Sequence, residues 1–173
     1  DNHAARMSRK GYPMDFVKLN ATIPPRDEAA AAAAQRHWDS IAKPLGSLGR
    51  LEELVVDMAG IFGTSDVQIE KRGVIVLCAD NGVVKEGVAQ SSPEVTFLVA
   101  QNLTRKQTSV CRMAGVARAS VIPVDMGMLT PLDSPLILNR RVAAGTQNIA
   151  EGPAMTPEEA VTAIQAGIDL VRM

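Results

Sequence analysis

The amino-acid sequence predicts an α/β fold, namely a three-layer, doubly wound, Rossmann-like parallel sheet with helices on both faces, incomplete in this chain. Two short apolar runs, Val74–Leu77 and Ser120–Asp125, have the length and composition of buried parallel strands. Helical patterns lie between and after them, an alternation typical of an open α/β sheet. Both runs lead into an acid closely followed by glycine, Asp80-Asn81-Gly82 and Asp125-Met126-Gly127. Ligands bind at the carboxyl ends of such strands, so these two segments mark the expected site.

Composition narrows the class of protein and of partner. A length of 173 residues predicts one domain, or one domain with a small appendage, and 46% apolar residues suffice for a core. Aromatic residues make up only 3%, so we expect a core of aliphatic side chains and methionine. The net charge of −1, without a basic block, indicates neither a nucleic-acid partner nor an anionic membrane surface. No apolar run approaches the roughly 18 residues that a membrane span needs.

The N-terminal segment is interpreted separately from the fold. We expect residues 1–23 to be a tail or tag with a lead-in, and Met7 or Met14 to be the natural start. The segment has no apolar core of the kind that a secretory signal requires. Cys78 and Cys111 lie in apolar runs without metal-ligand spacing, which favours buried free thiols over a disulfide and a cytoplasmic location.

Two helices are expected before the first strand. Residues 27–43 contain six consecutive alanines, and Trp38 and Ile41 follow at a spacing that favours a packed helix. The segment "KPLGSLGR" interrupts the pattern, because its proline and glycines do not fit inside one helix. Ser47 is then expected to cap a second helix over Leu48–Ile61. That helix carries an apolar stripe at helical spacing, formed by Leu51, Leu54, Val55, Met58 and Ile61.

Three further helices and a long loop complete the pattern. Pro93–Thr104 and Gln107–Ala114 are expected to be helices between the two strands. Pro123, inside the second strand, hints at an edge position or a bulge. A loop rich in glycine and small residues follows, and Thr156-Pro157-Glu158-Glu159 then has the residues of a helix start, with an N-cap, a proline at the first position and a glutamate at the third.

Familiar catalytic motifs do not occur in the sequence. Dinucleotide-binding, P-loop and hydrolase-elbow patterns are missing, and no cluster of His, Cys, Asp or Glu has metal-ligand spacing. Neither His3 nor His37 has the surroundings of a catalytic group. We therefore expect no metal and no cofactor, and a site made of carboxylates, amides, hydroxyls and backbone groups.

The residues after the first strand allow two interpretations. Asp80, Asn81 and Gly82 suit a tight turn, but they also stand where a ligand would bind. Ser91 and Ser92 precede Pro93 and are natural helix caps, although a helix start over a cleft also suits a polar heterocycle. Glu86 is more typical of a solvated loop residue. The pattern alone leads to an α/β protein with a small-molecule cleft.

Three segments of the chain resemble one known family. "KPLGSLGRLEELVVDMAG", "VLCADNGVVKEGVAQSSPEVT" and "RVAAGTQNIAEGPAMTPEEA" occur in the order and spacing of the nicotinate-nucleotide:dimethylbenzimidazole phosphoribosyltransferases. The resemblance runs from about Pro24 to Met173. It implies that residues 24–173 are the N-terminal portion of an α/β phosphoribosyltransferase domain with a helical segment at its start.

The resemblance implies a ribosyl transfer in the cobalamin pathway. The phosphoribosyl group of nicotinate mononucleotide moves to a ring nitrogen of 5,6-dimethylbenzimidazole or a related base, giving α-ribazole phosphate and nicotinate. No cofactor is implied, because the leaving pyridinium already carries a positive charge. The family is dimeric, so a homodimer is expected. The main alternatives are a non-catalytic fragment that binds a nucleotide or heterocycle, and a generic Rossmann-like scaffold.

The resemblance also implies which residues contact the acceptor base. The expected pocket residues are Asp80, Asn81, Gly82, Ser91, Ser92, Val95 and Val99. No catalytic residue is expected in this chain, because the glutamate that acts as general base in the family belongs to a position beyond Met173. The 173-residue chain is therefore expected to be inactive by itself.

Overall fold

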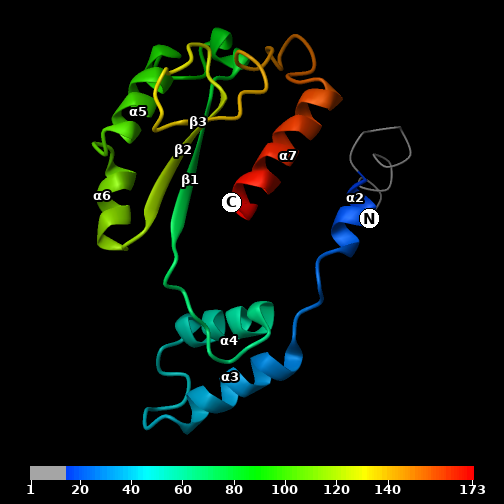
Figure 1. Ribbon diagram of the computed structural model, residues 1–173, viewed down its shortest axis with the longest axis vertical. Helices are drawn as coiled ribbons and strands as arrows, with labels where there is room; N and C mark the ends of the chain where they lie inside the picture. The colour runs from blue at the N-terminus through cyan, green and yellow to red at the C-terminus, as the bar shows by residue number, and fades with distance from the viewer. Residues whose placement is uncertain (1–14) are drawn as a thin grey trace. The chain divides into compact units, whose positions relative to one another are not determined.

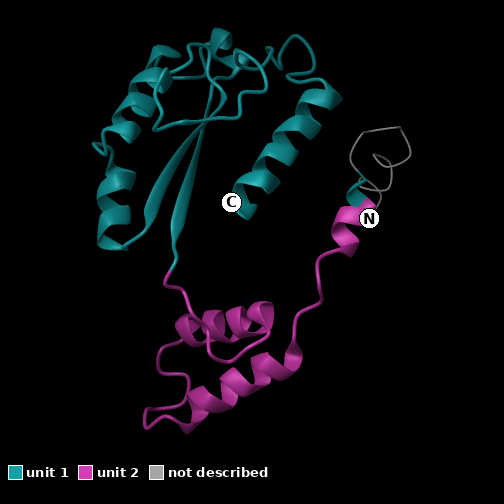
Figure 2. Ribbon diagram, in the orientation of Figure 1, with its two compact units in different colours: residues 1–16, 71–173 teal, residues 17–70 magenta. Residues whose placement is uncertain are grey.

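The computed structural model describes residues 15–173. The expected tail within residues 1–14, including His3 and both candidate start methionines, lies outside the described residues. The chain divides into two compact units, one formed by residues 17–70 and one that contains residues 71–173 (Figure 2). The short helix α2 (Phe16–Ala21) begins next to the boundary between them.

The helical unit is built on two helices that pack against each other, α3 (Glu28–Ser40) and α4 (Arg50–Phe62). Asp27 caps α3, since its carboxylate Oδ1 accepts a 2.9 Å hydrogen bond from the backbone N–H of Ala30. The buried residues of α3 come from its alanine run, namely Ala30, Ala31 and Ala34. The expected packed helix is confirmed, but Ile41 does not pack it, because the small alanines form the buried face and Ile41 is exposed at the C-cap.

The start of α4 also differs from the expectation. Its N-cap is Gly49, with a φ of 55°, so Ser47 does not cap it. The carboxylate of Glu52 takes the place of a cap, because it accepts a 3.0 Å hydrogen bond from the backbone N–H of Leu48. Glu52 is buried and forms an ion pair with Lys43 at 2.8 Å, and the Lys43 ammonium lies 5.4 Å from the centre of the Trp38 ring. The segment "KPLGSLGR" is thus held by the charged side chain of Glu52, which contacts it at Lys43 and at Leu48.

The second unit is an open parallel sheet, as predicted. Strand β1 (Gly73–Ala79) pairs in parallel with β2 (Ser120–Gly127), and β2 pairs in parallel with β3 (Leu138–Asn139), giving the order β1-β2-β3. The two long strands coincide with the predicted apolar runs, whereas β3 lies inside the predicted loop. Figure 1 shows α5 and α6 on one side of the sheet and α7 on the other.

Pro123 occupies the central strand, so the expectation of an edge position is wrong. It pairs with Val76 of β1, but the two-residue β3 begins its pairing only at Val124, one residue later. Proline is therefore compatible with this position, because no partner strand faces it on the β3 side. The irregularity of β2 lies near its end, where Cys78 pairs with Asp125 and Ala79 with Gly127, leaving Met126 as the extra residue.

The helices of this unit start and end close to their predicted limits. They are α5 (Glu94–Thr104), α6 (Ser109–Val116) and α7 (Pro157–Arg172). The predicted capping box is confirmed, since Thr156 Oγ1 accepts from the N–H of Glu159 at 3.1 Å and the Glu159 carboxylate accepts from the N–H of Thr156 at 2.7 Å. The core is aliphatic and sulfur-rich, formed by the buried residues Cys78, Ala100, Leu103, Met128 and Ile137.

Candidate functional site

Asp80 joins the ends of β1 and β2. Its carboxylate Oδ2 accepts a 2.7 Å hydrogen bond from the backbone N–H of Leu129, and its own backbone N–H donates to the Gly127 carbonyl at 3.0 Å. The Asp80 carbonyl in turn accepts from the N–H of Thr146 at 3.0 Å. Asp80 is only 6% exposed, so these contacts fix the backbone from which the following loop departs.

Asp125 plays the same local role at the end of β2. Its carboxylate Oδ1 accepts hydrogen bonds from the backbone N–H groups of Gly127, at 3.0 Å, and Met128, at 2.9 Å. The residue is 3% exposed. Both acids at the strand ends are therefore buried, and each holds a loop through its carboxylate. This agrees with a turn-forming role for Asp at such positions.

The loop after β1 is pressed against the loop that precedes α7. A short 3₁₀ helix, η1 (Gly82–Glu86), follows Asn81, and the N–H of Gly82 donates to Thr146 Oγ1 at 3.2 Å. A methyl group on Gly82 would stand 2.5 Å from the carbonyl carbon of Gln147 and 2.6 Å from the backbone carbonyl oxygen of Thr146. Only glycine fits here, because the two backbones touch.

One cavity at the end of β1 gathers six of the seven predicted pocket residues. It has a volume of about 370 Å³ and lies between the strand end, η1 and the start of α5. Its lining includes the predicted residues Asp80, Asn81, Ser91, Ser92, Val95 and Val99. We call it the base cavity, after the acceptor base that the family resemblance implies for these residues. Gly82, the seventh residue, lines an adjacent cavity of about 360 Å³ that also contains Thr146 and Asn148.

The two serines do not cap α5. The N-cap is Pro93, without a side-chain hydrogen bond, and among residues 15–173 neither serine hydroxyl has a hydrogen-bond partner. The Ser92 carbonyl accepts from the N–H of Val95 at 3.1 Å, in a turn at the start of α5. Both hydroxyls therefore remain available to a bound molecule. Val95 and Val99, one helical turn apart on α5, are 40% and 43% exposed beside them.

The interpretation of Glu86 as a solvated loop residue is incomplete. Its side chain is exposed, but Oε1 accepts a 2.6 Å hydrogen bond from Nδ2 of Asn148, which is buried. Sequence reasoning did not single out Thr146, Asn148 or Leu129, all of which fix the loops around the base cavity. Thr146 and Asn148 belong to "GTQN", in the third segment that carries the family resemblance, and this was the available signal.

The base cavity contains few groups that could move a proton. Among its lining residues the sole carboxylate is Asp80, already engaged with Leu129. The pKa of the Cys78 thiol is raised, chiefly by burial and then by the charges of Asp125 and Asp80. Cys78 and Cys111 are both free thiols, as predicted, but Cys111 is half-buried rather than buried. Within residues 15–173 there is no cluster of His, Cys, Asp or Glu that could hold a metal ion.

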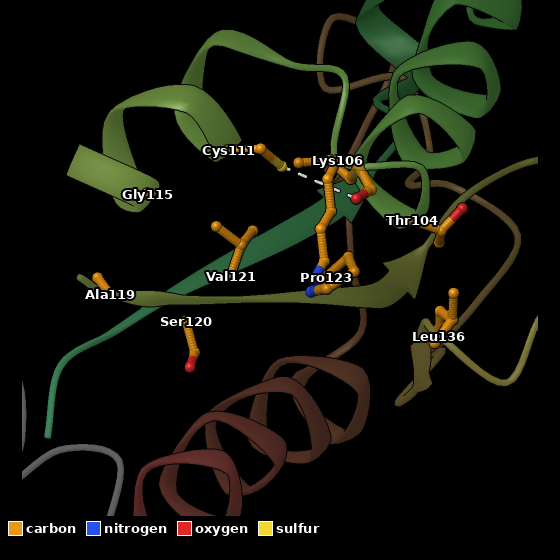
Figure 3. A pocket seen from close by; sticks show the side chains of 10 residues that line it. Thr104, Lys106, Cys111, Gly115, Ala119, Ser120, Val121, Pro123 and Leu136 are labelled. Carbon is orange, nitrogen blue, oxygen red and sulfur yellow. Dashed lines mark hydrogen bonds between the residues drawn. The ribbon is translucent and has the colours of Figure 1, made fainter. Parts of the chain in front are cut away.

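Another cavity, of about 390 Å³, lies away from the predicted residues (Figure 3). It is bounded by the end of α5, by α6 and by the first half of β2. Figure 3 shows Lys106 extending toward Pro123, and Cys111, whose Sγ donates to the Leu103 carbonyl at 3.8 Å. None of the residues predicted for the site lines this cavity.

As to membranes, none of the helices within 15–173 combines the length and apolarity needed to cross one.

Comparisons with known proteins agree on one family. A family model described as phosphoribosyltransferase matches residues 23–173. A nicotinate-nucleotide–dimethylbenzimidazole phosphoribosyltransferase of Escherichia coli (strain SE11) is 48% identical over 147 residues, which are 84% of this chain and 41% of that protein. The protein of the same name from Ruminiclostridium cellulolyticum is 44% identical over 138 residues, 80% of this chain and 39% of its own.

A solved structure gives the same result for the fold. The crystal structure of the nicotinate-nucleotide–dimethylbenzimidazole phosphoribosyltransferase from Thermus thermophilus superposes with a TM-score of 0.80 at 38% identity. The superposition covers 84% of this chain and 44% of that chain. The matched region therefore spans about two fifths of the length of these relatives.

Proposed function

The chain belongs to the family of nicotinate-nucleotide–dimethylbenzimidazole phosphoribosyltransferases, and from this membership we propose that the whole protein transfers a phosphoribosyl group from nicotinate mononucleotide to 5,6-dimethylbenzimidazole or a related base. The products are α-ribazole phosphate, for the lower ligand of cobalamin, and nicotinate. Within this reaction, residues 15–173 supply the pocket for the acceptor base.

The base cavity is the observation that carries this proposal. Its volume of about 370 Å³ falls within the ~300–1,000 Å³ of small-molecule pockets. Val95 and Val99 offer an apolar wall to a flat aromatic ring, and the hydroxyls of Ser91 and Ser92 can donate to or accept from a ring nitrogen. A benzimidazole needs this combination, because it has a planar apolar body and two polar nitrogens on one edge.

The chemistry asks the protein for positioning and for one proton transfer. A ring nitrogen of the base attacks C1′ of the ribose, and the bond from C1′ to the pyridinium nitrogen breaks. The electron pair of that bond stays on the ring nitrogen and removes its positive charge, so nicotinate leaves as a neutral pyridine ring with its carboxylate. The acceptor's N–H proton must pass to a general base. Asp80 is a poor candidate for that base, because its carboxylate is buried and accepts from Leu129. We therefore assign acceptor binding, rather than proton transfer, to the predicted residues.

The assignment of acceptor binding to these residues also defines the second candidate function, which is a pocket that binds a heterocycle without catalysing its reaction. This second function is favoured because Asp80 is the sole carboxylate that lines the base cavity, and its side chain already accepts a hydrogen bond from Leu129. The two functions differ in one readout. Formation of α-ribazole phosphate from the two substrates, followed by mass spectrometry, reports transfer, whereas calorimetry with the base alone reports binding.

The proposal is tested by isothermal titration calorimetry of the chain with 5,6-dimethylbenzimidazole. We expect saturable binding that Val99→Trp weakens at least tenfold, because an indole would fill the base cavity. Val116→Trp is the matched control, since Val116 is also helical, is 89% exposed and lines none of the cavities described above. No binding by the unmodified chain, or equal binding by both variants, would refute the proposal.

The proposal extends to assembly and location, both of which rest on the family resemblance. We propose a cytoplasmic homodimer. Sedimentation velocity tests the assembly: a species of twice the 18.4 kDa chain mass is expected, and monomer at all protein concentrations would contradict it.

A further inference from the structure

A long-range hydrogen bond connects η1, which borders the base cavity, to the loop that lines the adjacent cavity. Glu86 Oε1 accepts from Asn148 Nδ2 at 2.6 Å, between residues that are 62 positions apart. Glu86 is the last residue of η1, and Asn148 lies in the loop between β3 and α7. A carboxylate that accepts from an amide forms a charge-assisted hydrogen bond, which is stronger than a neutral one.

The side chain of Asn148 is oriented for this contact. It is 6% exposed, and its Oδ1 accepts a 3.1 Å hydrogen bond from the backbone N–H of Ala150. With the oxygen engaged there, the amide nitrogen must face Glu86. A buried amide nitrogen without an acceptor would cost free energy, so Glu86 satisfies a group that the fold has already buried.

The opposite end of η1 is held by a separate set of contacts. The Gly82 N–H donates to Thr146 Oγ1 at 3.2 Å, and the absence of a side chain lets Gly82 lie directly on the backbone of Thr146 and Gln147. Val84, in the middle of η1, lines both the base cavity and the adjacent cavity. Any rotation of η1 about its Gly82 end would therefore move Val84 and alter the shape of both.

We propose that Glu86 and Asn148 are positioning residues for the acceptor base, holding η1 so that Val84 and Asn81 keep the base cavity in its binding shape. This inference rests on the proposed function, because it takes the benzimidazole-type base as the occupant. Neither residue needs to touch the base. Their contribution passes through η1, and it is lost when the hydrogen bond between the two loops is lost.

The test combines two substitutions, of which one breaks the bond and the second restores it. Asn148→Asp places a carboxylate against Glu86, so the bond is replaced by repulsion. Glu86→Gln alone keeps an acceptor oxygen and should have a small effect. In the double variant E86Q/N148D, the new amide at position 86 donates to the new carboxylate at position 148, which can still accept from Ala150. Glu151→Gln is the control, an exposed carboxylate of the same loop without a side-chain partner among residues 15–173.

Two measurements are made on every variant of the full chain. Hydrogen exchange of the η1 amides reports opening of η1 directly, since the N–H of Gly87 donates to the Val84 carbonyl at 3.0 Å. Calorimetry gives the Kd for 5,6-dimethylbenzimidazole. We expect N148D to accelerate exchange and to raise Kd about three- to tenfold, the size of one typical net hydrogen bond. E86Q/N148D should recover both values, and E151Q should change neither.

Each other outcome has a defined meaning. Unchanged exchange in N148D overturns the inference, as does faster exchange with an unaltered Kd, which would make the bond purely structural. If the unmodified chain does not bind the base, the proposed function fails and the inference about base positioning fails with it, although exchange still shows whether the bond holds η1. If N148D does not fold, Glu86→Ala replaces it, because this substitution at an exposed position also removes the hydrogen bond to Asn148.

Discussion

The carboxylate of Asp80 accepts a 2.7 Å hydrogen bond from the backbone N–H of Leu129, 49 residues further along the chain. This bond ties the end of β1 to the segment that follows β2. Because Asp80 is also the first residue of the loop that leads to η1, the same contact fixes where the base cavity begins. Asp80 therefore holds one end of the base cavity, and we propose that Asn81 and the residues at the start of α5 contact the bound base.

Removal of this contact should destabilise the sheet unit. Asp80→Ala leaves the N–H of Leu129 without its acceptor, and hydrogen bonds to a buried charged group contribute about 1.5–3 kcal/mol. We expect the free energy of unfolding in urea to fall by about 2 kcal/mol. Asp133→Ala, at a loop position away from the strand ends, is the control and should change it by less than about 0.5 kcal/mol. Equal effects of the two substitutions would contradict the role of Asp80.

Gly82 should tolerate no side chain. In Gly82→Ala the new methyl group would meet backbone atoms at 2.5–2.7 Å, and backbone cannot move aside as a flexible side chain can. Overpacking of this kind costs about 1–3 kcal/mol, and here it should also displace η1 and weaken base binding. Gly152→Ala is the matched loop control, because nothing lies within 4 Å of its Cβ position. Thermal melting and calorimetry of both variants check this, and a G82A chain that melts and binds as the unmodified chain does would refute it.

Cys78 should make stability fall at alkaline pH. Burial raises the pKa of its thiol in the folded chain above the ordinary value of about 8.5. Above that pH the unfolded chain loses the proton and the folded chain keeps it, so the contribution present at neutral pH is lost as pH rises. Between pH 8.5 and 9.5 we expect the unmodified chain to lose up to about 1 kcal/mol more than Cys78→Ala in urea unfolding. Parallel pH profiles of the two proteins would show that the shift is absent.

Glu52 should make the helical unit sensitive to acid. Its pKa is lowered by Lys43 first and by the N–H of Leu48 second. This contribution is present above the unfolded pKa of about 4.3 and is lost as pH falls through the lower folded value. Glu52→Gln should therefore lower the melting temperature at pH 7, and the difference from the unmodified chain should shrink at pH 3. Circular dichroism melts at the two pH values decide this, and a constant difference would exclude the ion pair as its cause.

Local signals in the sequence predicted the framework of the fold. The apolar runs that became β1 and β2 are short and bounded by glycine or acid, and the start of α7 carries its capping box in four consecutive residues. Such signals need no distant partner. The seven pocket residues came instead from the family resemblance. They lie in one stretch after β1, and the strand end and the start of α5 bring six of them to one cavity.

The parts that could not be predicted depend on contacts across the chain. β3 has only two residues and no periodicity, and it exists because β2 offers it a partner. Ser47, Ser91 and Ser92 are good caps by composition, but Glu52 supplies the first contact at α4 and a turn supplies the start of α5. The role of Glu86 is set by Asn148, 62 residues away. No local pattern contains that information.

The most direct test of the central claim is to map the acceptor base onto the chain by solution NMR. In ¹⁵N–¹H spectra of the 18.4 kDa chain titrated with 5,6-dimethylbenzimidazole, we predict saturable shifts of the amides of Asn81, Ser91, Ser92, Val95 and Val99. The amides of Lys106 and Ala119, beside the cavity of Figure 3, should not shift. Shifts confined to the cavity of Figure 3, or no saturable shifts at all, would contradict the assignment of the base cavity.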